Sequence, residues 1–323
     1  MTNNRKKYFL FFLAWLVINS LLLAGVFVYS IHRESSCDGC DSVIVEYSEN
    51  DDYIAELLVK NGVSDSPWLC KIAVRLLKNC GFRPRIGEYK LSQHISIMEA
   101  IRIFACGDAV IHKITISEGL AVVRVIKLLN DNEFLLGKIE NIPEEGSLMP
   151  ATYFFQYPTN RQQIIELAQR YMKQFIEREW PKRSNACMLK TPQEAIVLAS
   201  IVEKETSCER EKIAGVFFNR LMKNMRLQSC PTVIYAITHG EPLGRKLTLT
   251  DLKTKSSYNT YRNNGLPPAP ITNPGRESII AVLHPELHDD MFFVLQDGKR
   301  HAFSKTFEEH KKKKAAIQKQ LDR

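Results

Sequence analysis

Residues 194–235, EAIVLASIVEKETSCEREKIAGVFFNRLMKNMRLQSCPTVIY, decide the fold of this chain of 323 residues. The segment opens with a nearly continuous apolar run, which predicts a helix that is buried on most of its surface. Two acids, Glu203 and Glu205, then interrupt the run. Because an isolated charge in apolar surroundings is costly, each acid is expected to be paired or protonated.

The two acids are predicted to have separate surroundings. They lie two residues apart, about 200° around a helix axis, so they cannot share one pocket. Glu205 follows Leu198 and Ile201 at helical spacing, which places it on the inner apolar row. Glu203 is expected to face the other way, as a partner of Lys204 or in a structural ion pair.

Glu205 is the candidate catalytic residue. An apolar wall raises the pKa of a carboxyl group by desolvation, and a general acid must hold its proton near neutral pH. A protonated acid is also what cleavage of a glycosidic bond requires. From spacing alone the alternative is a helix-end acid that is paired with Arg210 or Arg220.

Local sequence signals predict further helices around this segment. Residues 191–194 combine an N-cap, a first-turn proline and a capping box, so the central helix is expected to begin there. Residues 159–162 fit a capping box for an earlier helix that ends at Trp180–Pro181. Apolar residues at helical spacing predict another helix over about residues 209–223.

The C-terminal part is expected to be irregular. Prolines recur there, and long ordered loops usually serve a site rather than a core. Near the end, the apolar segments Phe292–Leu295 and His301–Phe303 flank Asp297–Gly298. This pattern predicts a hairpin with a type I′ turn.

Residues 42–109 are predicted to form a small α+β module. The expected elements, in order, are a strand near Val43, helices beginning near Asp52 and Ser66, a strand at Gly87–Tyr89 and a helix through Ile97 and Phe104. No group of polar residues in this module is predicted to meet at one site. A second domain, 110–323, begins with an alternating strand at 110–116.

The N-terminus is predicted to anchor the chain in a membrane. Tyr8–Ile31 is a 24-residue, almost wholly apolar run, and roughly 20 residues cross a bilayer. Basic residues 5–7 precede it, so residues 1–34 are expected to hold a cytoplasmic N-terminus and a single span, with the rest exported. The alternative is a cleaved signal peptide, although the run exceeds a usual h-region and no Ala-x-Ala site follows. Residues 35–41 are expected to form a linker.

Eight cysteines in an exported domain raise the question of disulfides. Their roughly one hundred possible pairings cannot be distinguished from the sequence. Cys37 and Cys40 form a single CxxC, which is a weak zinc signal without a second ligand pair. A local disulfide or free thiols are expected there rather than a metal site.

Several other chemistries find no support. The net charge of +8 is moderate, and the Lys311–Lys314 run is expected to be a solvated helix face or tail. No nucleic-acid motif accompanies it, so no nucleic-acid partner is predicted. No GxSxG, HExxH or P-loop pattern occurs, and Cys208 and Cys230 have no identifiable histidine partner. Neither a metal nor a cofactor is predicted.

A series of motifs resembles the YceG-like lytic transglycosylases, the endolytic murein transglycosylase family. The central motifs are SIVEKET at 200–206, AGVFFNRL at 214–221 and PTVIY at 231–235. Later motifs, in matching order, are SYNTY at 257–261, GLPP at 265–268, NPG at 273–275 and HP at 284–285. Earlier ones are Glu118-Gly119 and Glu145-Gly146. The single anchor and a module similar to a LysM-like subdomain extend the resemblance over most of the chain.

The resemblance implies an enzyme that cuts peptidoglycan strands internally, between N-acetylmuramic acid and N-acetylglucosamine, and leaves 1,6-anhydro ends. The family's catalytic acid corresponds to Glu205. It would protonate the leaving oxygen and then take the proton of the attacking C6 hydroxyl, so one carboxylate suffices. Gln228, Tyr235, Asn259 and Tyr261 are the candidates for holding the sugars; for each, a loop-stapling hydrogen bond is the alternative.

The resemblance also implies a location and partners. The chain would be a single-pass protein of the bacterial cytoplasmic (inner) membrane, with its catalytic domain on the periplasmic or outer face. Its partners would be peptidoglycan strands, the membrane and cell-wall synthases. Its role would be to terminate or release nascent strands.

Two acids of the family pattern are missing. Cys230 stands where the family usually has an Asp before Pro-Thr, and Ala151 stands where it usually has the Asp of Pro-Asp-Thr-Tyr. Either those acids were structural or this chain handles its substrate differently. Two alternatives therefore compete with the transglycosylase: a muramidase that uses water as nucleophile, and a non-catalytic wall-binding scaffold.

Together these features predict an α+β protein. A single transmembrane helix would precede the LysM-like module at 42–109. A mixed α/β catalytic domain at 110–323 would follow, with long Pro-rich loops and a C-terminal hairpin.

Overall fold

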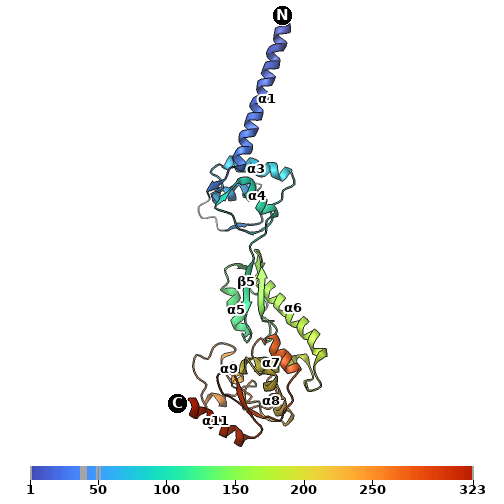
Figure 1. Ribbon diagram of the computed structural model, residues 1–323, viewed down its shortest axis with the longest axis vertical. Coiled ribbons are helices and arrows are strands. Elements are labelled where there is room, and N and C mark those ends of the chain that lie inside the picture. Colours follow the sequence, from blue (N-terminus) through green and yellow to red (C-terminus); the bar gives the residue numbers. More distant parts are fainter. Residues whose placement is uncertain (1, 37–41, 49, 51, 322–323) are drawn as a thin grey trace. The chain divides into compact units, whose positions relative to one another are not determined.

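A computed structural model of the chain describes residues 2–36, 42–48, 50 and 52–321 (Figure 1). The chain divides into two compact units. The first comprises Met1–His112 with Phe155–Pro158, and the second comprises Lys113–Phe154 with Thr159–Arg323. Cys37 and Cys40, which form the CxxC, lie outside the described residues.

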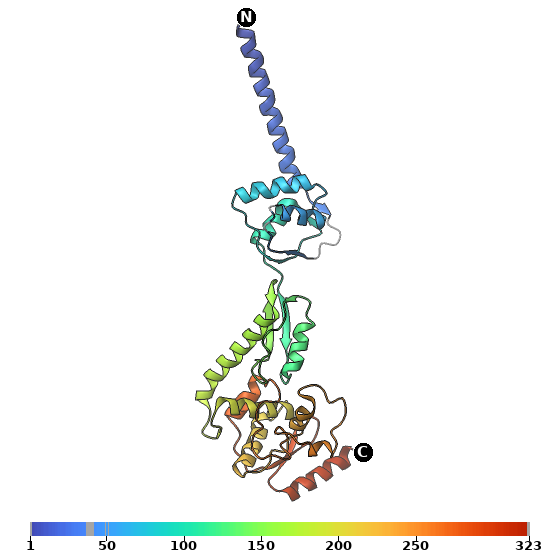
Figure 2. The same ribbon diagram turned by 180° about the vertical axis from the view of Figure 1, so that it is seen from behind.

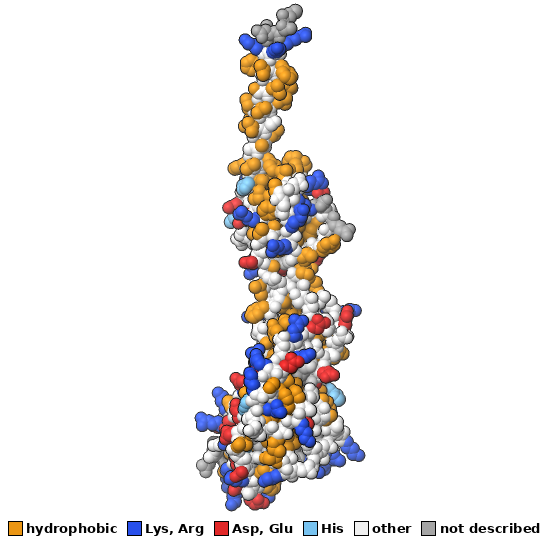
Figure 3. Space-filling view, turned by 90° about the vertical axis from the view of Figure 1, so that its right-hand side faces the viewer, with side chains coloured by type: hydrophobic (Ala, Val, Ile, Leu, Met, Phe, Trp, Pro, Cys, Tyr) orange, Lys and Arg blue, Asp and Glu red, His pale blue; other side chains and the backbone are white. Residues whose placement is uncertain are grey.

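Helix α1 (Thr2–His32) has the composition of a membrane span. Its segment Arg5–His32 contains 28 residues and reaches a mean hydropathy of 2.4. Hydrophobic side chains cover α1, and Lys and Arg side chains gather at its N-terminal end (Figure 3). By length and composition it is able to cross a membrane; a signal sequence would share these properties.

The rest of the first unit is a small α+β module built on two short antiparallel ladders. Strand β1 (Ser35–Ser36) pairs with β4 (His94–Ile95), and β2 (Val43–Val45) pairs with β3 (Gly87–Tyr89). Its helices are α2 (Tyr53–Lys60), α3 (Pro67–Asn79) and α4 (Ile97–Cys106). Their apolar faces meet the strands in one core. The predicted order of strand, two helices, strand and helix is confirmed.

The second unit is mostly helical, with three short two-stranded ladders. Strand β5 (His112–Ile116) pairs with β7 (Ala151–Phe155), β6 (Leu135–Leu136) pairs in parallel with β8 (Thr159–Asn160), and β9 (Phe292–Leu295) pairs antiparallel with β10 (His301–Ser304). Its helices are α5 (Val122–Asn130), α6 (Arg161–Glu179), α7 (Pro192–Glu205), α8 (Arg210–Met222), α9 (Cys230–Thr238), α10 (Arg276–Leu283) and α11 (Phe307–Leu321). Short 3-10 turns lie at Trp180–Lys182 and Asp251–Lys253.

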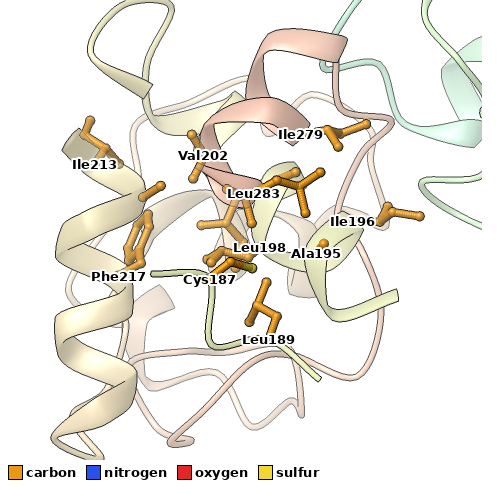
Figure 4. Close-up of a cluster of buried hydrophobic side chains, with 14 of the residues drawn as sticks. Cys187, Leu189, Ala195, Ile196, Leu198, Val202, Ile213, Phe217, Ile279 and Leu283 are labelled. Atoms are coloured by element: carbon orange, nitrogen blue, oxygen red, sulfur yellow. The ribbon is translucent and has the colours of Figure 1, made fainter. Parts of the chain in front are cut away.

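Helix α7 forms the centre of this unit. Every residue from Ala195 to Val202 is buried, as the apolar run predicts. The helix packs against α8, α9 and α10. Figure 4 shows Leu198 and Val202 among side chains of α8 and α10, including Phe217 and Leu283. This packing leaves the end of α7, with its two acids, at the edge of the core.

The predicted N-cap and first-turn proline of α7 are confirmed, whereas the predicted capping box is wrong, because Glu194 accepts the Lys190 N–H at 2.6 Å and not the Thr191 N–H. Pro192 occupies the first turn, and the Thr191 hydroxyl accepts the Glu194 N–H at 3.2 Å. The capping box predicted for α6 is wrong by one residue, because Asn160 and Gln163 form it. Thr159 and Gln162 have the same spacing as Asn160 and Gln163, so the sequence alone does not show which pair forms the capping box.

The Pro-rich C-terminal part is more regular than expected. Helices α9 and α10 occur within it, and Pro231 lies in the first turn of α9, where a proline suits a helix. The hairpin β9–β10 is confirmed. Its type I′ turn is wrong, because Gly298 has a positive φ but Asp297 does not, and Gln296 pairs with Arg300 around a longer connection.

Helix α11, dark red in Figure 2, packs on this hairpin. It carries Lys311–Lys314 as an exposed face, as predicted.

A buried asparagine joins distant parts of the second unit. Asn273 is fully buried, and its side chain donates to the Leu120 carbonyl at 2.9 Å and accepts the Leu148 N–H at 3.0 Å. Its backbone carbonyl also accepts the Gly119 N–H. The segments that open the second unit are therefore held by a residue near its end.

All six cysteines that the structure describes are free thiols. Cys70 and Cys187 are buried, whereas Cys80, Cys106, Cys208 and Cys230 are exposed.

Candidate active site

Glu205 is the last residue of α7 and lies half-buried at the edge of the core. The Ser229 hydroxyl donates a hydrogen bond of 2.5 Å to its Oε1. Ser229 is the N-cap of α9 and is only 2% exposed. The site therefore joins the C-terminal end of one buried helix to the N-terminal end of another.

Buried hydroxyl groups hold Ser229 in place. Its N–H donates to the Thr260 hydroxyl at 3.0 Å, and its carbonyl accepts the Thr232 hydroxyl at 2.7 Å. The two threonine hydroxyls lie 2.8 Å apart, and both residues are buried. Because each of these groups has a partner, the network is satisfied and the direction of the Ser229 hydroxyl is fixed.

Burial raises the pKa of Glu205 above its ordinary value, while the Ser229 hydrogen bond and the charge of Arg220 oppose this rise. Arg220 is itself buried and donates to the carbonyls of Met291, at 2.7 Å, and Leu227, at 2.5 Å. Neither Arg220 nor Arg210 forms an ion pair with Glu205 in the described part of the chain. The alternative of a helix-end ion pair is therefore not what the structure contains.

Glu203 lies in a different environment. Its carboxylate accepts the Gly275 N–H at 2.9 Å and the Ser278 hydroxyl at 2.7 Å, and Arg210 lies 3.7 Å away. The prediction of separate surroundings and of a structural ion pair is confirmed. The prediction that Glu203 faces outward is wrong, since its side chain is 7% exposed. The N-terminal end of α10 covers that face of α7 and supplies the donors.

Two of the four residues predicted to hold sugars lie on the segments around Ser229. Gln228 is exposed, has a φ of 51° and donates its N–H to the Thr260 carbonyl. The Tyr261 hydroxyl lies 3.1 Å from the Cys230 sulfur, and burial raises the pKa of this tyrosine. The charge of Glu205 acts on the same hydroxyl, so Tyr261 and Cys230 belong to the surroundings of Glu205.

Asn259 is placed differently. It is fully buried, and its amide donates to the carbonyls of Leu252, at 3.0 Å, and Thr254, at 2.8 Å. Its side-chain oxygen accepts the Tyr261 N–H. These contacts favour the loop-stapling alternative for Asn259. The other departure from the family pattern, Ala151, begins strand β7.

Tyr235 brings in an acid that the sequence did not single out as a functional residue. The Tyr235 hydroxyl lies 3.4 Å from Oε2 of Glu145, and Oε1 of the same side chain accepts the N–H of Val122 at 3.0 Å. Burial raises the pKa of Glu145 to about 7. Glu145 lies outside any helix or strand, so no periodicity indicated that it would be covered.

Lys204, which precedes Glu205, and Tyr235 both line a cavity of about 400 Å³. Within the described ranges, no group of three or more His, Cys, Asp or Glu side chains is arranged to hold a metal ion. The half-buried carboxyl group of Glu205, with its raised pKa, suits proton transfer to and from a bound substrate.

Comparison with known proteins identifies the relatives of this chain. The sequence profile of the YceG-like family matches residues 43–316. The chain is 30% identical to the endolytic murein transglycosylase of Bacillus subtilis (strain 168), over 91% of this chain and 90% of that protein. It is also 33% identical to the protein of that name from Streptococcus pneumoniae, over 46% of this chain and 28% of that protein.

A solved structure is similar as well. The 2.6 Å crystal structure of a YceG-like protein from Listeria monocytogenes aligns with a TM-score of 0.52 and 30% identity, covering 84% of this chain and 98% of that one. Since the family profile spans most of the chain and the relatives agree with it, the chain belongs to the YceG-like family.

Proposed function

We propose that this protein is an endolytic peptidoglycan lytic transglycosylase with Glu205 as its catalytic acid and base. The observation that carries the proposal is the half-buried Glu205 carboxyl, which burial keeps toward its protonated form and which a buried hydroxyl orients. Membership of a family whose named relatives are endolytic murein transglycosylases supports the reaction class.

The reaction needs one carboxyl group. Glu205 gives its proton to the oxygen that leaves with N-acetylglucosamine as the bond to the anomeric carbon of N-acetylmuramic acid breaks. The C6 hydroxyl of the same muramyl residue then attacks that carbon, and the Glu205 carboxylate takes the hydroxyl proton. The product is a 1,6-anhydro end and no water is consumed. The Ser229 hydroxyl stabilises the carboxylate between the two steps.

The remaining parts of the chain suggest where the reaction takes place. Residues 1–34 would form a single membrane anchor, with the N-terminus in the cytoplasm and residues 42–323 on the outer face of the bacterial inner membrane. The module at 42–109 would bind the wall in the manner of a LysM-like module. Cutting close to the membrane would terminate nascent strands beside the cell-wall synthases.

Digestion of purified peptidoglycan by the full chain in detergent tests the proposal. We expect 1,6-anhydro ends by mass spectrometry, a loss of about 100-fold to 10,000-fold in rate for Glu205→Gln, and none for Glu211→Gln, whose side chain is exposed on α8. Full activity of Glu205→Gln would refute the site.

The products also separate the alternatives. Ends heavier by one water, about 18 mass units, would indicate a muramidase. Binding to peptidoglycan without any cleavage would indicate a scaffold.

A further inference from the structure

The cavity beside Glu205 has no part in the mechanism above. Its volume of about 400 Å³ falls in the range of small-ligand sites, roughly 300–1,000 Å³. Its walls come from the start of α5, the end of α7, one face of α9 and residues 271–272. Lys204 immediately precedes Glu205, and Pro231 follows the Glu205 partner Ser229 by two residues, so the cavity adjoins the candidate active site.

One wall of the cavity contains an unpaired polar group. Thr272 lines the cavity and is 1% exposed, and its buried hydroxyl has no hydrogen-bond partner among the residues that the structure describes. Leaving a buried hydroxyl unpaired destabilises the folded state, and such groups are uncommon in folded proteins. Because Thr272 also lines the cavity, its hydroxyl is the lining group that would gain a hydrogen bond from a bound ligand.

The charged residues of the lining favour an anion. Lys204 is exposed, and its ammonium lies 3.4 Å from the Gly119 carbonyl. The described residues include no ion-pair partner for it, whereas Arg124 faces Glu241 at 3.6 Å. The lining therefore has a net positive charge, and Lys204 is available to a carboxylate.

The other lining side chains are largely aliphatic, including Leu120, Ile234 and Ile271. A neutral sugar ring presents hydroxyl groups on its edges and has no charge for Lys204. A short peptide with small alkyl groups, amides and a carboxylate matches the lining at each point: the aliphatic wall, the Thr272 hydroxyl and the Lys204 ammonium.

We propose that this cavity binds the acidic stem peptide carried by the muramyl residue that is cleaved. The inference rests on the function proposed above. The peptide is attached through the lactyl group to the same sugar whose anomeric carbon reacts at Glu205, so it begins next to the catalytic acid. Lys204 binds a peptide carboxylate, and the Thr272 hydroxyl bonds to a peptide amide.

Ligand binding to the full chain in detergent micelles tests this without requiring cleavage. The probe is N-acetylmuramyl-L-alanyl-D-glutamate, and N-acetylmuramic acid, which has only the lactyl carboxylate, is the comparison. We expect the dipeptide to bind more tightly in an NMR titration. Thr272→Val and Lys204→Met should each weaken its binding about fivefold to tenfold, as expected for one hydrogen bond.

Matched variants separate binding from stability. Ser304→Ala removes another buried, unpaired hydroxyl, on β10, and Lys190→Met removes an exposed cation; both should bind as wild type does. Lys204→Met changes an exposed side chain, so it tests the proposal even if Thr272→Val fails to fold.

Three results would overturn the inference: no binding by the wild-type protein, equal affinity for both probes, or unchanged affinity in Lys204→Met. Dipeptide binding without any anhydro product would refute the transglycosylase and leave the peptide site standing.

Discussion

Replacing Glu145 by glutamine should remove a pH dependence from the stability of the second unit. The two carboxyl oxygens of Glu145 accept the Val122 N–H at 3.0 and 3.2 Å, and the Tyr235 hydroxyl lies 3.4 Å away. In the described part of the chain no cation forms an ion pair with it. Burial therefore dominates and raises its pKa from 4.5 to about 7.

The magnitude follows from the linkage between proton binding and folding. The folded unit holds this proton more tightly than the unfolded chain does. The contribution of the protonated acid to stability is therefore complete below about pH 4.5 and is lost as the pH rises through about 7. The difference between the two pKa values corresponds to about 3 kcal/mol. Between pH 4 and 8.5 the free energy of unfolding should fall by about that much more in the wild type than in Glu145→Gln.

Urea unfolding followed by the fluorescence of Trp180, which packs against the core of the second unit, measures this difference. The exposed Trp15 and Trp68 are first replaced by phenylalanine so that only this unit is observed. Other groups titrate equally in both proteins, so their contributions cancel. Glu166→Gln, an exposed acid on α6, should follow the wild type. Parallel stability curves for Glu145→Gln and wild type would refute the reasoning.

Two further predictions concern the site and its support. Ser229→Ala removes a hydrogen bond that favours the charged form of Glu205, so the pKa of Glu205 should rise. The alkaline limb of the pH–rate profile should then move to higher pH, and Ser229→Thr should return it to its wild-type position. An unchanged alkaline limb in Ser229→Ala would contradict the assignment. Gly146 has a φ of 78°, and an added Cβ would lie 2.6 Å from the Pro270 ring. Gly146→Ala should therefore destabilise the second unit by about 2–5 kcal/mol in urea unfolding, against about 1–2 kcal/mol for Gly298→Ala, which has a φ of 81° and open space around it. Equal losses would show that packing around Gly146 contributes nothing.

Features that depend on neighbours in sequence could be predicted. The N-cap at Thr191, the buried row of α7 and the separation of Glu203 from Glu205 follow from helix geometry alone, and the structure contains each of them. The hairpin near the C-terminus followed from local signals in the same way, although the length of its connection did not.

Features that depend on distant segments could not be predicted. Glu203 was expected at the surface because nothing local showed that α10 would cover it. The hydrogen bond from Ser229 to Glu205 joins residues 24 positions apart through the placement of two helices. Helix α9 differs from the expected irregular chain because Pro231, one of the prolines that recur there, lies in the first turn of the helix. The raised pKa of Glu145 arises from burial among loops, and the packing of loops leaves no periodic sequence pattern from which it could be predicted.

The contacts of Asn273 also set an order of assembly during synthesis. Ribosomes make the chain from its N-terminus, so Leu120, Leu148 and the whole of α7 are made well before the asparagine that joins them. Until residue 273 and the following α10 emerge, the apolar flank of α7 lacks its cover and Glu203 lacks its donors. Closing these loops requires contacts of long sequence separation, which form slowly. The site therefore becomes competent only after residue 273 and α10 have been made, and fragments that end before residue 273 should stay open and be degraded readily by proteases.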